Sequence, residues 1–175
     1  MKTMVVALLA LGMPAQIPKE PAKDLFMHSQ KAPGIEIRFV DYHWHPELFD
    51  AFEKGANIPE AKRDWVIARV IVDARPFRIG GKLVAVGNYA LTLWPNLDGK
   101  GMMVEIRQVD MREVYPNLNA LAPAPRGETA YKGQVVFDKV TPLAERLDMT
   151  LADAAGKVLI TTNWGDRRLV LTFER

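Results

Sequence analysis

The feature that most constrains the fold is a rhythm of short strand-like runs separated by turn residues. In residues 35–39, apolar side chains alternate with charged ones, which is the period-two pattern of a half-buried strand. Further runs with strand character cover about residues 65–72, 77–79, 82–86, 88–94, 102–109, 131–138, 143–151, 157–163 and 168–174. Eight or nine short strands at about ten-residue spacing predict an all-β fold, an antiparallel β-sandwich or a jelly roll. A parallel α/β fold needs a crossover helix for each strand, and the spacing leaves no room for one.

Turn and helix signals complete this pattern. Gly80-Gly81 predicts a turn, because glycine reaches positive φ without a steric cost. Trp164-Gly-Asp-Arg167 predicts a short hairpin turn. Pro46 to Gly55 predicts a short helix, since proline suits the first helical position and glycine the C-terminal cap. A second helical turn at 59–64 would be weak, and residues 111–127 are expected to form irregular helical turns or a loop whose role stays open.

The N-terminus has the layout of a secretory signal peptide. Lys2 precedes about nine mostly apolar residues, and the small residue Ala15 follows. This run is far shorter than the roughly 20 residues of a transmembrane helix, so we expect no stable membrane insertion after cleavage. We therefore expect a signal peptide in residues 1–15, a proline-rich tether in 16–34 and one β-sandwich domain in 35–175. A protein of this kind would be periplasmic or secreted.

Charge and cysteine content exclude several functions. Lys and Arg number 23 and Asp and Glu number 21, a formal charge of +2, which argues against a nucleic-acid partner because phosphate binding needs a concentrated basic surface. The chain has no cysteine, so disulfides, thiolate metal sites and cysteine nucleophiles are excluded. Ser29 is the only serine, and no Gly-x-Ser-x-Gly elbow, P-loop or dinucleotide fingerprint is present. Glu105 with Asp110 would be a carboxylate pair, but its spacing does not distinguish it from surface charges.

Two segments resemble an uncharacterised bacterial family, domain-of-unknown-function family 2911. The first runs from Phe77 to Pro95 and contains a Gly-Gly-Lys turn followed by a Gly-x-Tyr-x-Leu strand; the second joins 145–151, 157–160 and Trp164. Val40-Asp-Tyr42 is similar to the start of that family's domain. The resemblance implies a secreted β-rich domain. The polar run at the centre of that family has no counterpart here, so no functional residue is carried over.

One cluster of residues suggests a metal site. In Asp41-Tyr-His43-Trp-His45-Pro-Glu47, Asp41, His43 and His45 would share one face if the strand from Ile35 continued, because side chains alternate along a strand. Two imidazoles and a carboxylate can bind a divalent transition metal, with His28 or Glu47 as a further ligand. The alternative is that the strand ends before Pro46 and that the histidines bond water or backbone.

Aromatic side chains suggest a binding surface instead. Trp94 and Trp164 flank predicted turns, so we expect them to be exposed, where an indole ring can stack on a sugar or enter a pocket of a partner protein. The function predicted first is therefore an exported, non-enzymatic β-sandwich module, without a cofactor, that binds a protein or a carbohydrate. The alternative is a metal-binding protein or metal-dependent enzyme using His43 and His45. The ligand and the oligomeric state stay open.

Overall fold

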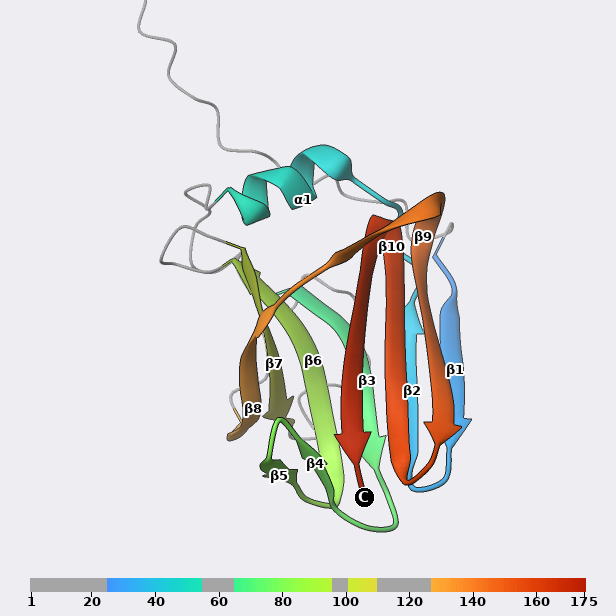
Figure 1. Cartoon of the computed structure of the whole chain (residues 1–175), viewed down its shortest axis with the longest axis vertical. Helices are drawn as coiled ribbons and strands as arrows, with labels where there is room; N and C mark the ends of the chain where they lie inside the picture. Colours follow the sequence, from blue (N-terminus) through green and yellow to red (C-terminus); the bar gives the residue numbers. More distant parts are fainter. Residues whose placement is uncertain (1–24, 55–64, 96–100, 110–126) are drawn as a thin grey trace, which may run out of the picture.

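The structure is a computed structural model of the chain, and it describes residues 25–54, 65–95, 101–109 and 127–175. Two antiparallel sheets pack face to face, which confirms the all-β sandwich (Figure 1). The larger sheet has the order β1 (Met27–Ala32), β2 (Ile35–Val40), β3 (Trp65–Val72), β6 (Gly87–Pro95), β7 (Met102–Gln108) and β8 (Thr129–Val135). The smaller sheet has the order β5 (Lys82–Val84), β4 (Phe77–Ile79), β10 (Lys157–Glu174) and β9 (Asp138–Ala154).

Several sequence predictions lie outside the described residues. They are the signal peptide in 1–15, the first part of the tether, the helical turn at 59–64 and nearly all of 111–127. Within the described ranges there is one helix, α1 (Pro46–Glu53), where a helix was predicted. No helix in those ranges is long and apolar enough to cross a membrane.

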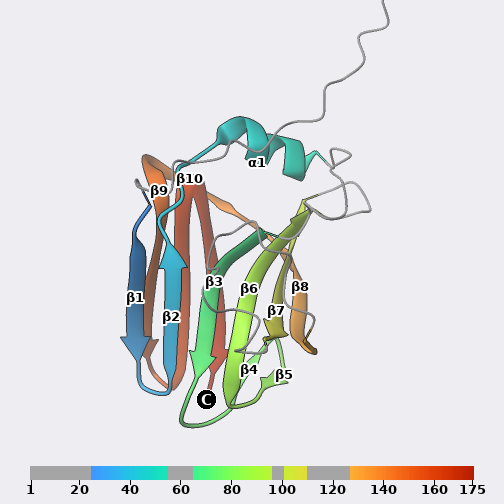
Figure 2. The ribbon, with the colours of Figure 1, turned by 180° about the vertical axis from the view of Figure 1, so that it is seen from behind.

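The tether prediction is wrong for its last part. Residues Met27–Ala32 form β1, an edge strand of the larger sheet that pairs with β2 from Val40 back to Ile35 (Figure 2). A tight turn at Pro33 and Gly34 joins the two strands, and Gly34 has φ 86°, a conformation that favours glycine. The strand carries no apolar alternation because nearly all its side chains are exposed. Backbone hydrogen bonds to β2 hold it in place, and these are independent of side-chain polarity.

The predicted turn at Trp164–Arg167 is confirmed. An extended strand of this length would separate its ends by roughly 60 Å, yet Lys157 Nζ lies 3.1 Å from Glu174 Oε1 and Arg175 N donates to Gly156 O at 3.0 Å. The chain of β10 therefore reverses on itself, and Figure 1 shows its two arms side by side. Gly165 lies at the reversal with φ 62°.

The core lies between the two sheets. It is formed mainly by alternate side chains of β2, β3, β6 and β7 on one side and of β4, β9 and β10 on the other. Representative members are Ile37, Leu91 and Val104, which are 0–1% exposed, and Ile160 and Phe173, which are fully buried. The burial of these large apolar side chains provides the main stabilisation of the sandwich.

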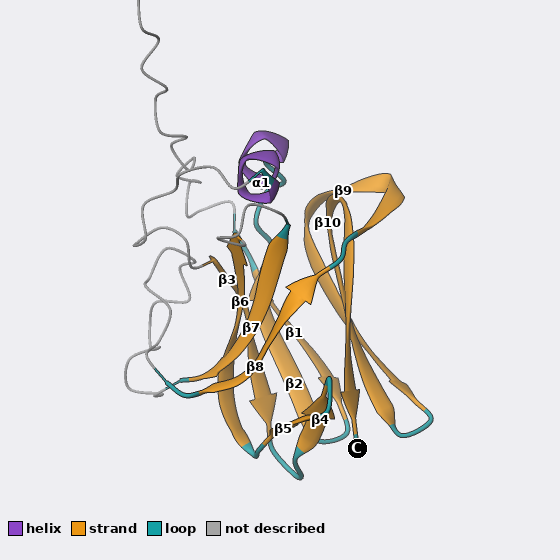
Figure 3. Cartoon of the chain, turned by 60° about the vertical axis from the view of Figure 1, so that its left-hand side comes forward, coloured by secondary structure: helices purple, strands orange, loops and turns teal. Residues whose placement is uncertain are grey.

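Helix α1 covers one end of the sandwich (Figures 1 and 3). Its Phe49 is 1% exposed and points into a cluster of aromatic rings. The centroid of its ring lies 4.9 Å from that of Trp44, 5.5 Å from that of Trp164 and 5.4 Å from that of Phe137. These rings come from the segment before α1, from the β10 reversal and from the β8–β9 junction, so Phe49 ties three distant parts of the chain together.

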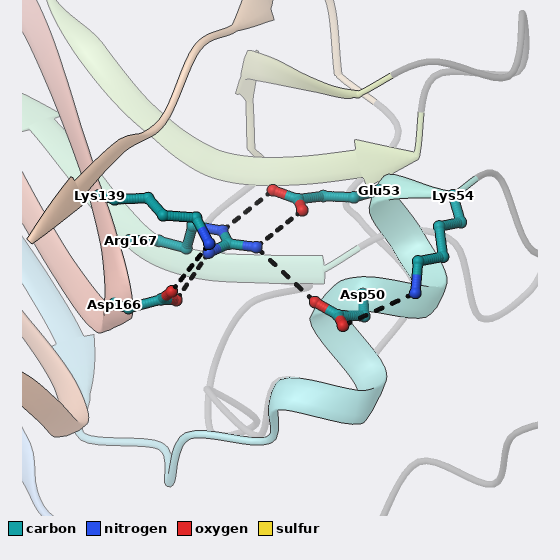
Figure 4. Close-up of polar contacts among 6 residues, drawn as sticks. All are labelled: Asp50, Glu53, Lys54, Lys139, Asp166 and Arg167. Carbon is teal, nitrogen blue, oxygen red and sulfur yellow. Dashed lines mark hydrogen bonds and ion pairs between the residues drawn. The ribbon is translucent and has the colours of Figure 1, made fainter.

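A buried arginine makes the polar contact between α1 and the smaller sheet (Figure 4). The side chain of Arg167 in β10 is 8% exposed, and its guanidinium donates to both carboxylate oxygens of Glu53 at 3.1 and 2.8 Å. It also donates to Asp166 at 2.7 Å and lies 3.7 Å from Asp50. The hydrogen bonds to Glu53 raise the pKa of Arg167 above its usual value, although burial lowers it. Lys139 lies 3.4 Å from Asp166 and supplies a second positive charge.

We expect Arg167→Met to lower the free energy of unfolding by about 2–3 kcal/mol, because three carboxylates would lose their shared cation. This value is near the low end for a broken buried pair, since the three carboxylates are partly exposed. Urea denaturation of the purified variant measures the change. Adding Glu53→Gln to Arg167→Met is expected to recover part of the loss, and a double variant with no recovery would show that the charge repulsion is unimportant.

Candidate functional site

The predicted Asp41, His43 and His45 do not share a strand face, which corrects that expectation. β2 ends at Val40, and three residues later His43 already forms a bridge to β9 of the other sheet. The Asp41 carboxylate accepts a hydrogen bond from Phe26 N at 2.6 Å and forms an ion pair with Arg146 at 3.1 Å. Burial raises the pKa of Asp41, but the Phe26 N–H, His28 and Arg146 together outweigh burial and lower it.

The two histidines lie in separate surroundings. His43 pairs with Arg146 of β9 in an isolated β-bridge, which joins the segment after β2 to the smaller sheet. His45 Nδ1 lies 3.6 Å from Glu47, and His28 Nε2 lies 3.6 Å from Asp41. Among the residues the structure describes, no three side chains of metal-ligating type form one group. The metal site therefore stays a prediction made from the sequence.

Trp164 is buried, so the expectation that it is exposed is wrong. It is 2% exposed, and its Nε1 donates to the backbone oxygens of Tyr42 at 3.1 Å and His43 at 3.2 Å. The reversal at Gly165 directs the indole inward beneath α1 rather than outward from the hairpin tip. Trp164 is part of the aromatic cluster around Phe49 and offers no surface to a ligand.

Trp94 lies in different surroundings. It is on β6, on the face of the larger sheet that points away from the core, and it is partly exposed. The Arg107 guanidinium carbon lies 5.7 Å from the ring centroid, and Lys132 Nζ lies 5.6 Å from it. Such cation–π contacts stabilise the orientation of an indole. Trp94 Nε1 is buried and has no hydrogen-bond partner among the described residues.

Strand register explains why these side chains meet. Thr92 of β6, Glu105 of β7 and Lys132 of β8 are direct cross-strand partners, so they form one row on the outer face. Trp94 and Arg107 belong to the neighbouring rows on either side of it. Facing side chains on neighbouring strands are about 5 Å apart, which allows long side chains to reach across rows.

This row contains a buried carboxylate. Glu105 is 2% exposed, and Arg107 Nη2 donates to both of its oxygens at 2.9 and 3.0 Å. Thr129 Oγ1 also donates to Glu105. Thr92 is 1% exposed, and its hydroxyl has no partner within the described ranges. In the sequence, Glu105 cannot be distinguished from a surface charge. The alternation of residues 102–108 does place it on the same face as Arg107. Its other partner, Thr129, is 24 residues away in the chain, so sequence spacing does not predict that contact.

We name this outer-face group, formed by Thr92, Trp94, Glu105, Arg107, Thr129 and Lys132, the Trp94 face. It combines an aromatic ring, two cations and two neutral polar groups that lack a partner within the described structure. The two neutral groups are buried, so the parts of this face that can meet a ligand from solution are the partly exposed ring and the cations beside it. The chemistry of this face suits the binding of a polar molecule with a ring to stack on the indole.

The comparisons with known proteins found no match: no family model, no curated protein and no solved structure is similar to this chain.

Proposed function

We propose that the chain is an exported β-sandwich module that binds a carbohydrate on the Trp94 face. The observation that carries the proposal is the Trp94 indole, a partly exposed ring with two cationic side chains beside it. A sugar offers a ring face that can stack on a partly exposed indole. Export rests on the pattern of residues 1–15, which is that of a signal peptide.

The geometry favours Trp94 over the other predicted sites. Trp164 is buried, and the Asp41 carboxylate is already engaged by Arg146 and Phe26 N. The orientation of the Trp94 ring is stabilised by Arg107 and Lys132, which lowers the entropic cost of ordering it when a ligand binds. Preorganised aromatic residues are among those that most often dominate binding energy.

We expect Trp94→Ala to weaken binding to a carbohydrate found by glycan-array screening by at least about tenfold, because aromatic residues dominate binding energy at such surfaces. Trp94→Phe keeps a smaller ring for stacking, so it is expected to retain part of the affinity. Isothermal titration calorimetry of the full chain measures both effects.

The matched control is Leu83→Ala, which removes an exposed apolar side chain from β5 in the other sheet. It should bind as the unsubstituted protein does. A Trp94→Ala variant that folds normally, as judged by circular dichroism, and binds with unchanged affinity would contradict the proposal. A module that binds no glycan but retains a protein in affinity capture would favour a protein partner instead.

A further inference from the structure

The side of the smaller sheet that points away from the core is a surface made by β9 and the two arms of β10 (Figure 3). Alternate residues of these strands are buried in the core, so the residues between them face outward. Across β9 and the first arm of β10, the register pairs Asp148 with Asn163, Thr150 with Thr161, Ala152 with Leu159, and Ala154 with Lys157. These four pairs define four rows across the surface.

The second arm of β10 continues the same rows. Lys157 Nζ lies 3.1 Å from Glu174 Oε1 at one end, and Arg168 Nε donates to Asn163 Oδ1 at 2.9 Å at the other. Both contacts give the same alignment of two antiparallel arms. Thr172 and Val170 therefore fall in the two rows between them.

Charge is confined to the two end rows of this surface. One end row holds Lys157 and Glu174, and the other holds Asp148 and Arg168. The two middle rows are uncharged and consist of Thr150, Thr161, Val170, Ala152, Leu159 and Thr172. Val170 is 44% exposed, so an apolar side chain of these rows meets solvent. An uncharged, partly apolar centre with a charged rim is typical of a protein–protein interface.

We propose that this surface binds the same surface of a second copy of the chain, about a two-fold axis that runs across the strands between the copies. Such an axis sets each strand on the same strand of the other copy, running in the opposite direction. Arg168 of one copy then faces Glu174 of the other, and the symmetry makes this contact twice. Val170 faces Thr172 between the two charge contacts. The surface is therefore complementary in charge to itself.

Arg168 and Glu174 are both available for this contact. Arg168 is exposed and forms no ion pair with any residue that the structure describes; its bond to Asn163 uses Nε and leaves the terminal nitrogens. Glu174 pairs with Lys157, but these side chains are 48% and 52% exposed. An exposed pair of this kind contributes little energy, so it does not prevent Glu174 from also binding an arginine.

The size of the surface sets the expected strength of the dimer. Three strands about 5 Å apart and four rows about 7 Å apart cover roughly 400 Å² per copy. A stable interface buries about 800 Å² per partner, so we expect a weak, reversible dimer with a dissociation constant on the order of 100 μM. The larger sheets lie on the outer sides of such a dimer, so the Trp94 face of each copy stays free. The inference is therefore independent of carbohydrate binding.

Sedimentation equilibrium of the full chain, at concentrations on both sides of the expected dissociation constant, tests the proposal. Arg168→Glu and Glu174→Arg each set like charges at both contacts, so each is expected to weaken the dimer by at least about tenfold. The double variant Arg168→Glu/Glu174→Arg restores opposite charges and is expected to bring the dissociation constant back to within about threefold of its original value. The control is Lys82→Glu, a charge reversal at an exposed position of β5 outside this surface, which should change nothing.

Val170→Glu, which places a charge in the uncharged centre, is expected to abolish the dimer. Circular dichroism of each variant checks that it folds. A chain that is monomeric at all concentrations would overturn the proposal, and so would a dimer that survives Val170→Glu. A two-fold axis along the strands would keep Arg168 and Glu174 in different rows, so a double variant that fails to recover would overturn the arrangement proposed.

Discussion

Phe49→Ala is expected to lower the free energy of unfolding by about 3–5 kcal/mol, the usual range for deleting a buried phenylalanine side chain. Phe49 is 1% exposed, and its ring contacts those of Trp44, Trp164 and Phe137. The cavity left behind lies beneath α1, and the surrounding aromatic rings, of which Trp44 and Trp164 also pack against each other, cannot collapse into it fully. Urea denaturation followed by tryptophan fluorescence measures the loss, because Trp164 lies in the same cluster.

A second substitution in α1 separates packing from helix formation. The Glu47 side chain is exposed in the first turn, so Glu47→Ala should change stability by less than about 0.5 kcal/mol. If Phe49→Ala also stayed within about 1 kcal/mol of the unsubstituted protein, α1 would not be anchored by the aromatic cluster. The same result would indicate that polar contacts, such as that of Glu53 with Arg167, hold the helix.

Gly165→Ala is expected to destabilise the protein by about 3–4 kcal/mol, for two separate reasons. Gly165 has φ 62°, a conformation that costs a residue with a Cβ roughly 1 kcal/mol. A Cβ at this position would also lie 2.0 Å from a ring carbon of Trp44. The Trp44 ring cannot yield easily, because it packs against Phe49 and Trp164. Thermal and urea unfolding of the variant measure the combined effect.

Gly156→Ala provides the matched control for this prediction. Gly156 has φ 83° in the β9–β10 turn, and nothing lies within 4 Å of the position a Cβ would take. Its substitution is therefore expected to cost only the roughly 1 kcal/mol of backbone strain. The double variant Gly165→Ala/Trp44→Leu should be more stable than the sum of the single losses implies. Equal losses in Gly165→Ala and Gly156→Ala would show that the contact with Trp44 does not matter.

The local sequence pattern was sufficient to predict most of the secondary structure. The β3 range of Trp65–Val72 and the reversal at Gly165 follow from β-branched residues, alternation and turn chemistry, which act over a few neighbouring residues. Helix α1 likewise follows from Pro46 and the spacing around Phe49. β1 was missed, because an exposed edge strand has no apolar side to bury, and only pairing with β2 makes it a strand.

The candidate site likewise contains residues that the sequence could identify and others that only the tertiary structure brings together. Trp94 was identifiable from the sequence as an aromatic residue near a turn, but Trp164 met the same criterion and is buried. Burial of a tryptophan depends on which distant segments cover it, and for Trp164 these are α1 and the segment around Trp44. Arg107, Thr129 and Lys132 join Glu105 and Trp94 only through the register of β6, β7 and β8.

Residue order alone was therefore enough for the fold class, the helix and the turns, since these depend on the periodicity and backbone preferences of adjacent residues. Which strand lies at an edge, which tryptophan is buried and which charges share a face were decided by tertiary structure. Those properties arise from contacts between residues far apart in the chain, such as Phe49 with Trp164 and Glu105 with Thr129. The spacing of residues along the sequence does not predict such contacts.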